Sequence, residues 1–230
     1  MFQNRQEAGK LLAERLESYR NNDEVAVLAI PRGGVVVGRQ IADKLHISLY
    51  LVVVKKLGAP NNPELAIGAV APYGTKMIDW DLALRLGVEQ DYLDEEIKRK
   101  QKEVEERQKK FSIFNFQFSN IKKKNIFIII DDGVATGATI SSAIKYIKQI
   151  SSVYSSSERQ RVEKLYENSS RQARTIILAV PVIAKDAYNR LQSEVDKIIA
   201  LEVPDAFGAV GEFYREFPQV TDEEVIKYLK

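Results

Sequence analysis

The stretch NIFIIIDDGVATGATISS, residues 125–142, decides the fold that this sequence predicts. Residues 126–130 are five apolar side chains in a row, a pattern typical of a strand that is buried on both faces of a parallel sheet. Asp131 and Asp132 follow directly. They stand at the carboxyl end of the predicted strand, where open α/β sheets present ligand-binding groups. The stretch therefore predicts a binding site at the edge of a sheet.

The residues after the acid pair are mostly small or carry hydroxyl groups: Gly133, Val134, Ala135, Thr136, Gly137, Ala138 and Thr139. Such a backbone can curl with its N–H groups turned around an anion. A helix predicted to begin within residues 137–139 adds the positive end of its dipole. The pattern favours a sugar-phosphate site, and the plainer alternative is a turn before a capped helix. A P-loop and a dinucleotide fingerprint are excluded by the missing Gly-Lys-Ser/Thr ending and by the glycine spacing.

The run DDGVATGAT resembles the phosphoribosyl-pyrophosphate (PRPP) signature of type I phosphoribosyltransferases. The resemblance implies a doubly wound, mostly parallel α/β sheet with a small hood, in a single domain over residues 1–230. It also implies transfer of 5-phosphoribosyl from PRPP to a nitrogen acceptor, with release of pyrophosphate. Asp131 and Asp132 would hold the ribose hydroxyls, directly or through Mg²⁺, and the seven loop residues would bind PRPP. Mg²⁺ is expected to be held mainly by substrate oxygens and water, so no dedicated metal ligands are expected.

A second strand-turn-helix, over residues 25–45, contains Pro-Arg-Gly-Gly in its turn. It directs another helix N-terminus and an arginine toward one point, which predicts a second anion site. The turn resembles the family's pyrophosphate loop, in which the peptide bond before the basic residue is often cis; the alternative is a plain Gly-Gly helix start. The residues that match this loop are Arg32, Gly33 and Gly34. With the acid pair, Arg32 completes the set of catalytic candidates.

Lys55 and Lys56 end the next predicted strand, residues 47–54, where a dinucleotide-binding fold would need an acid. By resemblance these lysines would bind pyrophosphate; the alternative is a solvated strand end. Residues 57–65, LGAPNNPEL, predict a flexible loop. In the family, a loop at this place closes over the substrates, although this one contains no lysine, arginine or histidine. Residues 66–78 predict a short hairpin.

The carboxyl half carries two further predictions. Residues 151–174 are polar and predict an insertion that buries little. Residues 203–217 resemble the hood of purine phosphoribosyltransferases, with Phe207 matching the aromatic ring that stacks on the base; the alternative is ordinary packing of this ring on the core. Thr221 and Glu224 form a capping-box pattern at the start of a final helix.

One difference from the family pattern restricts the choice of acceptor. In 6-oxopurine transferases, an acid stands two residues after the position of Gly133, and here that residue is Ala135. We therefore expect a nucleobase acceptor other than a 6-oxopurine. A PRPP- or nucleotide-binding regulator that performs no transfer is the alternative from another class.

Bulk properties restrict the partners and the compartment. The formal net charge is +2, which gives no general field for nucleic acid or an anionic membrane. No apolar run is long enough for a membrane span, and there is no cysteine. We therefore expect a cytoplasmic protein with neither nucleic acid nor a membrane as its partner. By resemblance its ligands would be PRPP and a small-molecule acceptor, and we expect a homo-oligomer such as a dimer. The single histidine, His46, is predicted to be structural, and the aromatic run in residues 111–118 is predicted to pack rather than to bind nucleic acid.

Overall fold

A computed structural model of the chain describes residues 1–72, 74–112, 124–152 and 174–229. Its main sheet has the strand order β2-β1-β6-β7-β8, and each neighbouring pair is parallel. The strands are β1 (Val25–Ala29), β2 (Leu49–Leu51), β6 (Ile126–Ile130), β7 (Thr175–Val182) and β8 (Lys197–Glu202). The helices around it are α1 (Arg5–Arg15), α2 (Gly33–Leu45), α6 (Ala138–Ser152), α8 (Lys185–Leu191) and α9 (Asp222–Leu229). A short 3₁₀ turn, η1 (Glu17–Tyr19), follows α1. The predicted doubly wound α/β fold is confirmed.

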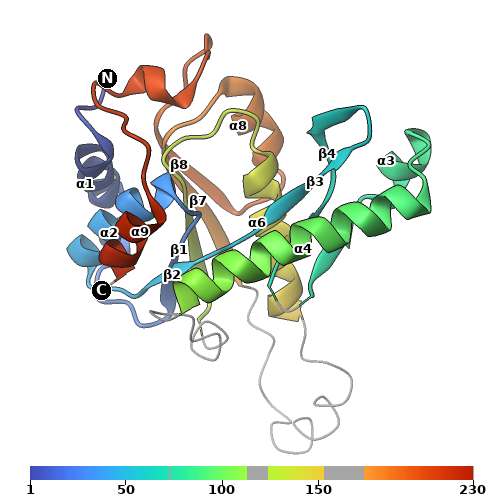
Figure 1. The fold of residues 1–230 in the computed structure, drawn as a ribbon. Helices are drawn as coiled ribbons and strands as arrows, with labels where there is room; N and C mark the ends of the chain where they lie inside the picture. Colours follow the sequence, from blue (N-terminus) through green and yellow to red (C-terminus); the bar gives the residue numbers. More distant parts are fainter. Residues whose placement is uncertain (73, 113–123, 153–173, 230) are drawn as a thin grey trace, which may run out of the picture.

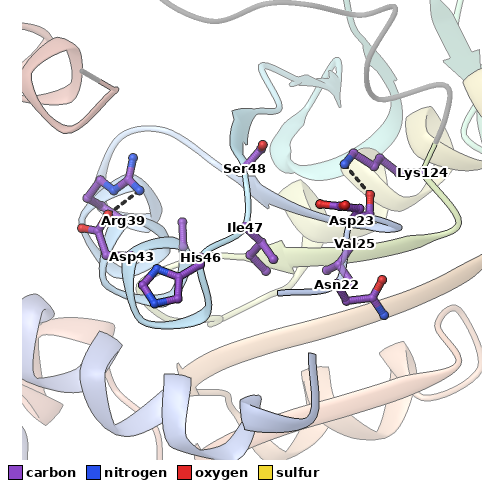
Figure 2. Close-up of a pocket in the computed structure, with 10 residues that line it drawn as sticks. Asn22, Asp23, Val25, Arg39, Asp43, His46, Ile47, Ser48 and Lys124 are labelled. Carbon is purple, nitrogen blue, oxygen red and sulfur yellow. Dashed lines mark hydrogen bonds and ion pairs between the residues drawn. The ribbon is translucent and has the colours of Figure 1, made fainter. Parts of the chain in front are cut away.

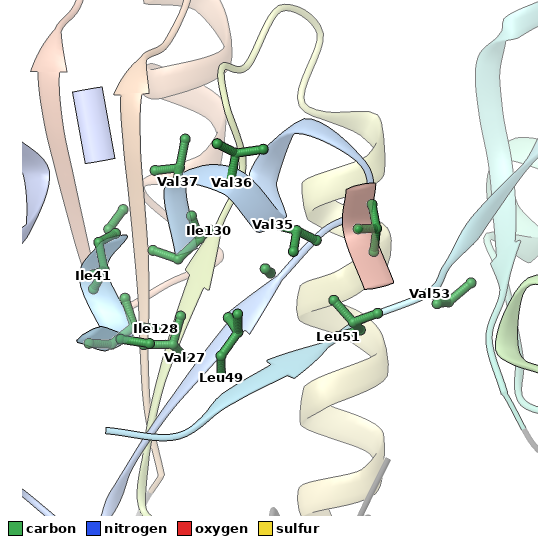
Figure 3. Packing of buried hydrophobic residues seen from close by; sticks show 14 of the residues in the cluster. Val27, Val35, Val36, Val37, Ile41, Leu49, Leu51, Val53, Ile128 and Ile130 are labelled. Carbon is green, nitrogen blue, oxygen red and sulfur yellow. The ribbon is translucent and has the colours of Figure 1, made fainter. Parts of the chain in front are cut away.

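The sheet is buried on both faces because the central strands are apolar at every position. Val27 and Ile128, which are paired across β1 and β6, belong to the core cluster that contains α1, α2 and α9. Ile129 belongs to the opposite cluster, with α6 and α8. Figure 3 shows Val27 and Ile128 gathered with Ile41 of α2. The run of residues 126–130 therefore serves both layers of the core, as a buried parallel strand should.

A smaller antiparallel sheet lies beside the main one, on the right in Figure 1. It consists of β3 (Lys55–Ala59), β4 (Asn62–Val70) and β5 (Lys76–Ile78), and it is followed by α3 (Trp80–Arg85) and the long α4 (Gln90–Ser112). The hydroxyl of Tyr92 in α4 donates a hydrogen bond to the Gly58 carbonyl, at 2.9 Å. Helix α4 thereby holds the β3–β4 hairpin, and the predicted hairpin of residues 66–78 is confirmed as β4 and β5.

Two predictions in this region are wrong. The strand predicted for residues 47–54 ends at Leu51, because β1 ends at Ala29 and the N–H of Val52 makes the last bond to it, at 2.9 Å. Lys55 and Lys56 therefore begin β3 instead of ending β2. Residues 57–65, predicted as a flexible loop, form the end of β3, a turn and the start of β4. The prolines and asparagines that suggested a loop are accommodated in this hairpin, with irregular pairing between β3 and β4.

The first residues of the chain pair with residues 213–215. The N–H of Phe2 donates to the Phe213 carbonyl at 2.7 Å, and the N–H of Arg215 donates to the Phe2 carbonyl at 2.8 Å. The segment predicted as a hood, residues 203–217, contains the 3₁₀ helix η2 (Val210–Phe213). The first residues of the chain therefore form part of its support. Most of the predicted insertion, at residues 153–173, and most of the aromatic run, at residues 113–118, lie outside the described residues.

Candidate functional site

The acid pair lies at the point where the winding of the sheet reverses. From β1 the chain passes to β2 on one side, whereas β6 lies on the other side of β1. Asp131 and Asp132 follow β6 directly, and helices α2 and α6 begin close to the carboxyl ends of β1 and β6 on opposite faces. Such a switch point forms the crevice in which open α/β sheets bind ligands.

The glycines of the Pro-Arg-Gly-Gly turn press against the acid pair. A Cβ atom on Gly33 would lie 1.7 Å from Asp132 Oδ2, and one on Gly34 would lie 2.8 Å from the Ile130 carbonyl oxygen. Only glycine fits such a close approach. The structure therefore brings together the two motifs that the sequence places about a hundred residues apart. The Pro31–Arg32 peptide bond is cis, as the resemblance implies.

Two helix starts present unused N–H groups on either side of the acids. Within the described part of the chain, no acceptor receives a hydrogen bond from the main-chain N–H groups of residues 135–139 or of Gly33 and Gly34. The first N–H groups of a helix lack intrahelical partners and are suited to an anion. The loop itself is anchored, because the N–H of Val134 donates to the Val182 carbonyl at 2.9 Å and Arg190 donates to the Thr136 carbonyl.

Arg5 is a site residue that the sequence analysis missed. Its Nε donates to Asp132 Oδ2 at 2.6 Å, and its Nη1 donates to the Pro218 carbonyl at 2.7 Å. The guanidinium also lies 3.6 Å from the centre of the Phe217 ring. No local pattern could have revealed this role, because Arg5 lies in an N-terminal helix in which charged residues are common.

Burial and mutual repulsion shape the electrostatics of the acids. Burial raises the pKa of Asp131 well above its ordinary value, and the neighbouring charge of Asp132 raises it further. The main-chain N–H of Asp132 donates to Asp131 Oδ1 at 2.9 Å, which opposes this shift. Arg5 supplies the nearest positive charge. The two carboxyl groups therefore have different partners: Asp132 bonds Arg5, whereas Asp131 accepts from a main-chain N–H.

The hood touches the motif directly. The Tyr214 hydroxyl donates to the Asp132 carbonyl at 2.5 Å, and burial raises the pKa of Tyr214. A Cβ atom on Gly133 would lie 2.4 Å from a methyl carbon of Val210. Phe207 is half-buried and stacks on Phe213, with ring centres 5.2 Å apart. One face of the Phe207 ring therefore packs on another aromatic side chain of the hood.

The basic residues predicted to bind pyrophosphate, Arg32, Lys55 and Lys56, lie in different parts of the fold. Lys55 Nζ lies 3.0 Å from Glu103 Oε2 of α4. Lys56 lies next to it in β3. Arg32 directly precedes α2, and within the described residues its side chain has no ion pair. Arg32 is therefore the basic candidate nearest in the chain to the glycines that touch the acids.

A separate cavity of about 310 Å³ lies at the amino end of β1, whereas the acid pair lies at the carboxyl ends of the strands. It is lined by Val25, the first residue of β1, and by His46, which ends α2 in the left-handed conformation. Figure 2 shows Arg39 bonded to Asp43 within this lining. None of the predicted site residues lines it. The role of His46 in ending α2 agrees with a structural histidine.

The acid pair suits a metal ion that is held partly by the protein and partly by a phosphate-bearing substrate. In the described ranges there is no group of three or more His, Cys, Asp or Glu side chains that could hold a metal ion. Mg²⁺ commonly takes one or two carboxylates from a protein when phosphate oxygens and water supply its other ligands, and the acid pair offers two.

Among the described residues, no helix is long and apolar enough to cross a membrane.

The sequence profile of the phosphoribosyl transferase domain matches residues 2–152, and the chain belongs to this family. Two curated relatives from Mycobacterium tuberculosis, strains H37Rv and CDC 1551, are provisionally named phosphoribosyl transferases. Each is 31% identical over 229 residues, which cover 100% of this chain and 46% of the relative. The chain thus spans about half the length of these relatives.

A solved structure also resembles the chain over nearly its whole length. The crystal structure of TT1426 from Thermus thermophilus matches with a TM-score of 0.76 and 34% identity. The match covers 99% of this chain and 97% of that one. The similarity to this structure therefore extends past residue 152, where the match to the family profile ends.

Proposed function

We propose that this protein is a Mg²⁺-dependent phosphoribosyltransferase that transfers 5-phosphoribosyl from PRPP to a nitrogen acceptor and releases pyrophosphate. One observation carries the proposal: an acid pair lies between two helix starts whose N–H groups have no acceptor in the described structure. PRPP has two anionic groups separated by a ribose. The arrangement offers a donor set for each anionic group and carboxylate acceptors for the hydroxyls between them.

The proposed contacts follow from this order of groups. The N–H groups of residues 135–139 bind the 5-phosphate at the start of α6. Gly33, Gly34 and the Arg32 side chain bind the pyrophosphate at the start of α2. Asp131 and Asp132 accept hydrogen bonds from the ribose hydroxyls. Fixed donors around the departing pyrophosphate stabilise the charge that develops on it in the transition state.

Mg²⁺, when bound with PRPP, would neutralise pyrophosphate charge and so make it a better leaving group. Asp131 and Asp132 are the protein groups that could contact it. The two lysines of β3 are more distant candidates for the pyrophosphate, and the Lys55–Glu103 pair would have to open for a direct contact by Lys55.

We propose a nucleobase other than a 6-oxopurine as the acceptor. Ala135 offers no group that could handle a proton on such a base. Phe207 is half-buried, and the face of its ring that is not stacked on Phe213 is the proposed surface for a base.

The test is pyrophosphate release from PRPP and Mg²⁺ across a panel of nucleobases and amines. Release that requires one acceptor and stops with a metal chelator would support the proposal. The Asp131→Asn, Asp132→Asn double variant is the matched negative control, because it keeps the size of both side chains. PRPP binding without turnover across the panel would instead favour the regulator.

A further inference from the structure

Arg5 is among the few buried charged side chains in the described residues, with 7% of its surface exposed. It comes from α1, which lies far from the motif in sequence, and it reaches both the acid pair and Phe217 of the hood. Burying a guanidinium is costly unless its donors are satisfied. Here Nε bonds Asp132, Nη1 bonds the Pro218 carbonyl, and the flat face lies on Phe217. The site thus holds Arg5 on three sides.

The hydrogen bond from Arg5 Nε fixes one of the two carboxylate oxygens of Asp132. Oδ2 accepts from Arg5 and lies where a Cβ on Gly33 would be, so the carboxylate has little room to turn. The Asp132 carboxylate also lies beside the side chain of Asp131, with which it interacts. The main-chain carbonyl of Asp132 accepts from Tyr214. Asp132 is therefore held at its main-chain carbonyl by the hood and at one carboxylate oxygen by Arg5.

We propose that Arg5 is a positioning residue that orients Asp132 for the ribose hydroxyls of PRPP and joins this acid to the hood. The inference rests on the proposed function. A planar guanidinium can bond two acceptors in fixed directions, whereas a lysine ammonium supplies the charge without this geometry. Lysine in place of Arg5 should keep a cation beside Asp132 and lose the bridge to Pro218.

The experiment compares PRPP with inorganic pyrophosphate, which has no ribose. Calorimetric affinities for both would be measured with Mg²⁺ for the wild type, Arg5→Lys and Arg5→Met, below the thermal midpoint of each variant. Arg15→Met is the matched control, because Arg15 is an exposed arginine of the same helix. We expect PRPP affinity to fall at least tenfold in both Arg5 variants, and pyrophosphate affinity to stay within twofold. Arg15→Met should leave both unchanged.

Other results would overturn the inference. Equal weakening of PRPP and pyrophosphate would assign Arg5 a general structural role. Unchanged PRPP affinity in folded Arg5→Lys and Arg5→Met would show that Asp132 needs no such support. Should the wild type itself fail to bind PRPP, the proposed function fails first, and the inference fails with it.

Discussion

A single added methyl group at Gly33 would disturb the acid pair directly. In Gly33→Ala the new Cβ would lie 1.7 Å from Asp132 Oδ2. Ordinary non-bonded contacts begin at roughly 3.5 Å, so the carboxylate would have to recede by about 1.8 Å. This displacement would break the 2.6 Å contact between Asp132 and Arg5. The substitution therefore tests whether the position of this carboxylate matters.

The expected loss of PRPP affinity is of the size of the hydrogen bond between Arg5 and Asp132 that Gly33→Ala would break. A hydrogen bond that involves charged partners contributes about 1.5 to 3 kcal/mol. If PRPP binding depends on the position of Asp132, its affinity should fall by roughly 10- to 100-fold, since 1.4 kcal/mol corresponds to a factor of ten. Thermal stability should fall as well, because overpacking a filled site commonly costs about 1 to 3 kcal/mol.

The assay is calorimetric titration of PRPP with Mg²⁺, with thermal unfolding measured on the same samples. Gly87→Ala is the control, because Gly87 has a φ of +62° and open space around it. Alanine there should cost stability through backbone strain of about 1 to 2 kcal/mol without affecting the site. Unchanged PRPP affinity in Gly33→Ala, or equal losses of affinity in both variants, would refute the reasoning.

Three further perturbations test other parts of the molecule. Arg32→Ala should cost PRPP about 2 to 4 kcal/mol of binding and ribose 5-phosphate much less, because only PRPP carries pyrophosphate; equal losses in calorimetry would place Arg32 elsewhere. Phe207→Leu should raise the KM for the acceptor and leave PRPP affinity unchanged, and steady-state kinetics with an unchanged KM would remove the stacking role. Lys110 lowers the pKa of Asp222 through a 2.9 Å hydrogen bond. This pair therefore stabilises the fold fully above the ordinary aspartate pKa, and the stabilisation is lost as the pH falls through the lowered pKa of Asp222. Lys110→Met should therefore show a smaller drop in thermal midpoint between pH 7 and pH 3 than the wild type, and an equal drop would contradict this.

Local patterns predicted much of the fold. The buried strands were visible because their apolar runs have no polar interruption, as in residues 126–130. The final helix was visible because its cap is local: the N–H of Glu224 donates to Thr221 Oγ1 at 3.1 Å, and the N–H of Thr221 donates to Glu224 Oε2 at 2.7 Å. The end of β2 was missed because it depends on the length of the neighbouring strand β1.

The candidate site was predictable only where it follows a strand. The acid pair and the Pro-Arg-Gly-Gly turn each follow one, so their meeting could be expected from a parallel sheet. Arg5 could not be expected, because its bonds to Asp132 and Pro218 join residues 127 and 213 positions apart. The same holds for the pairing of Phe2 with Tyr214. Such contacts between distant segments leave no periodic signal in the sequence.

The central claim is that the acid pair between the two helix starts binds the ribose of PRPP. It is tested most directly by calorimetric titration of PRPP with Mg²⁺ into the wild type and the Asp131→Asn, Asp132→Asn double variant. We expect saturable binding by the wild type and at least a tenfold loss of affinity in the folded variant. Equal PRPP affinity in the two proteins would contradict it.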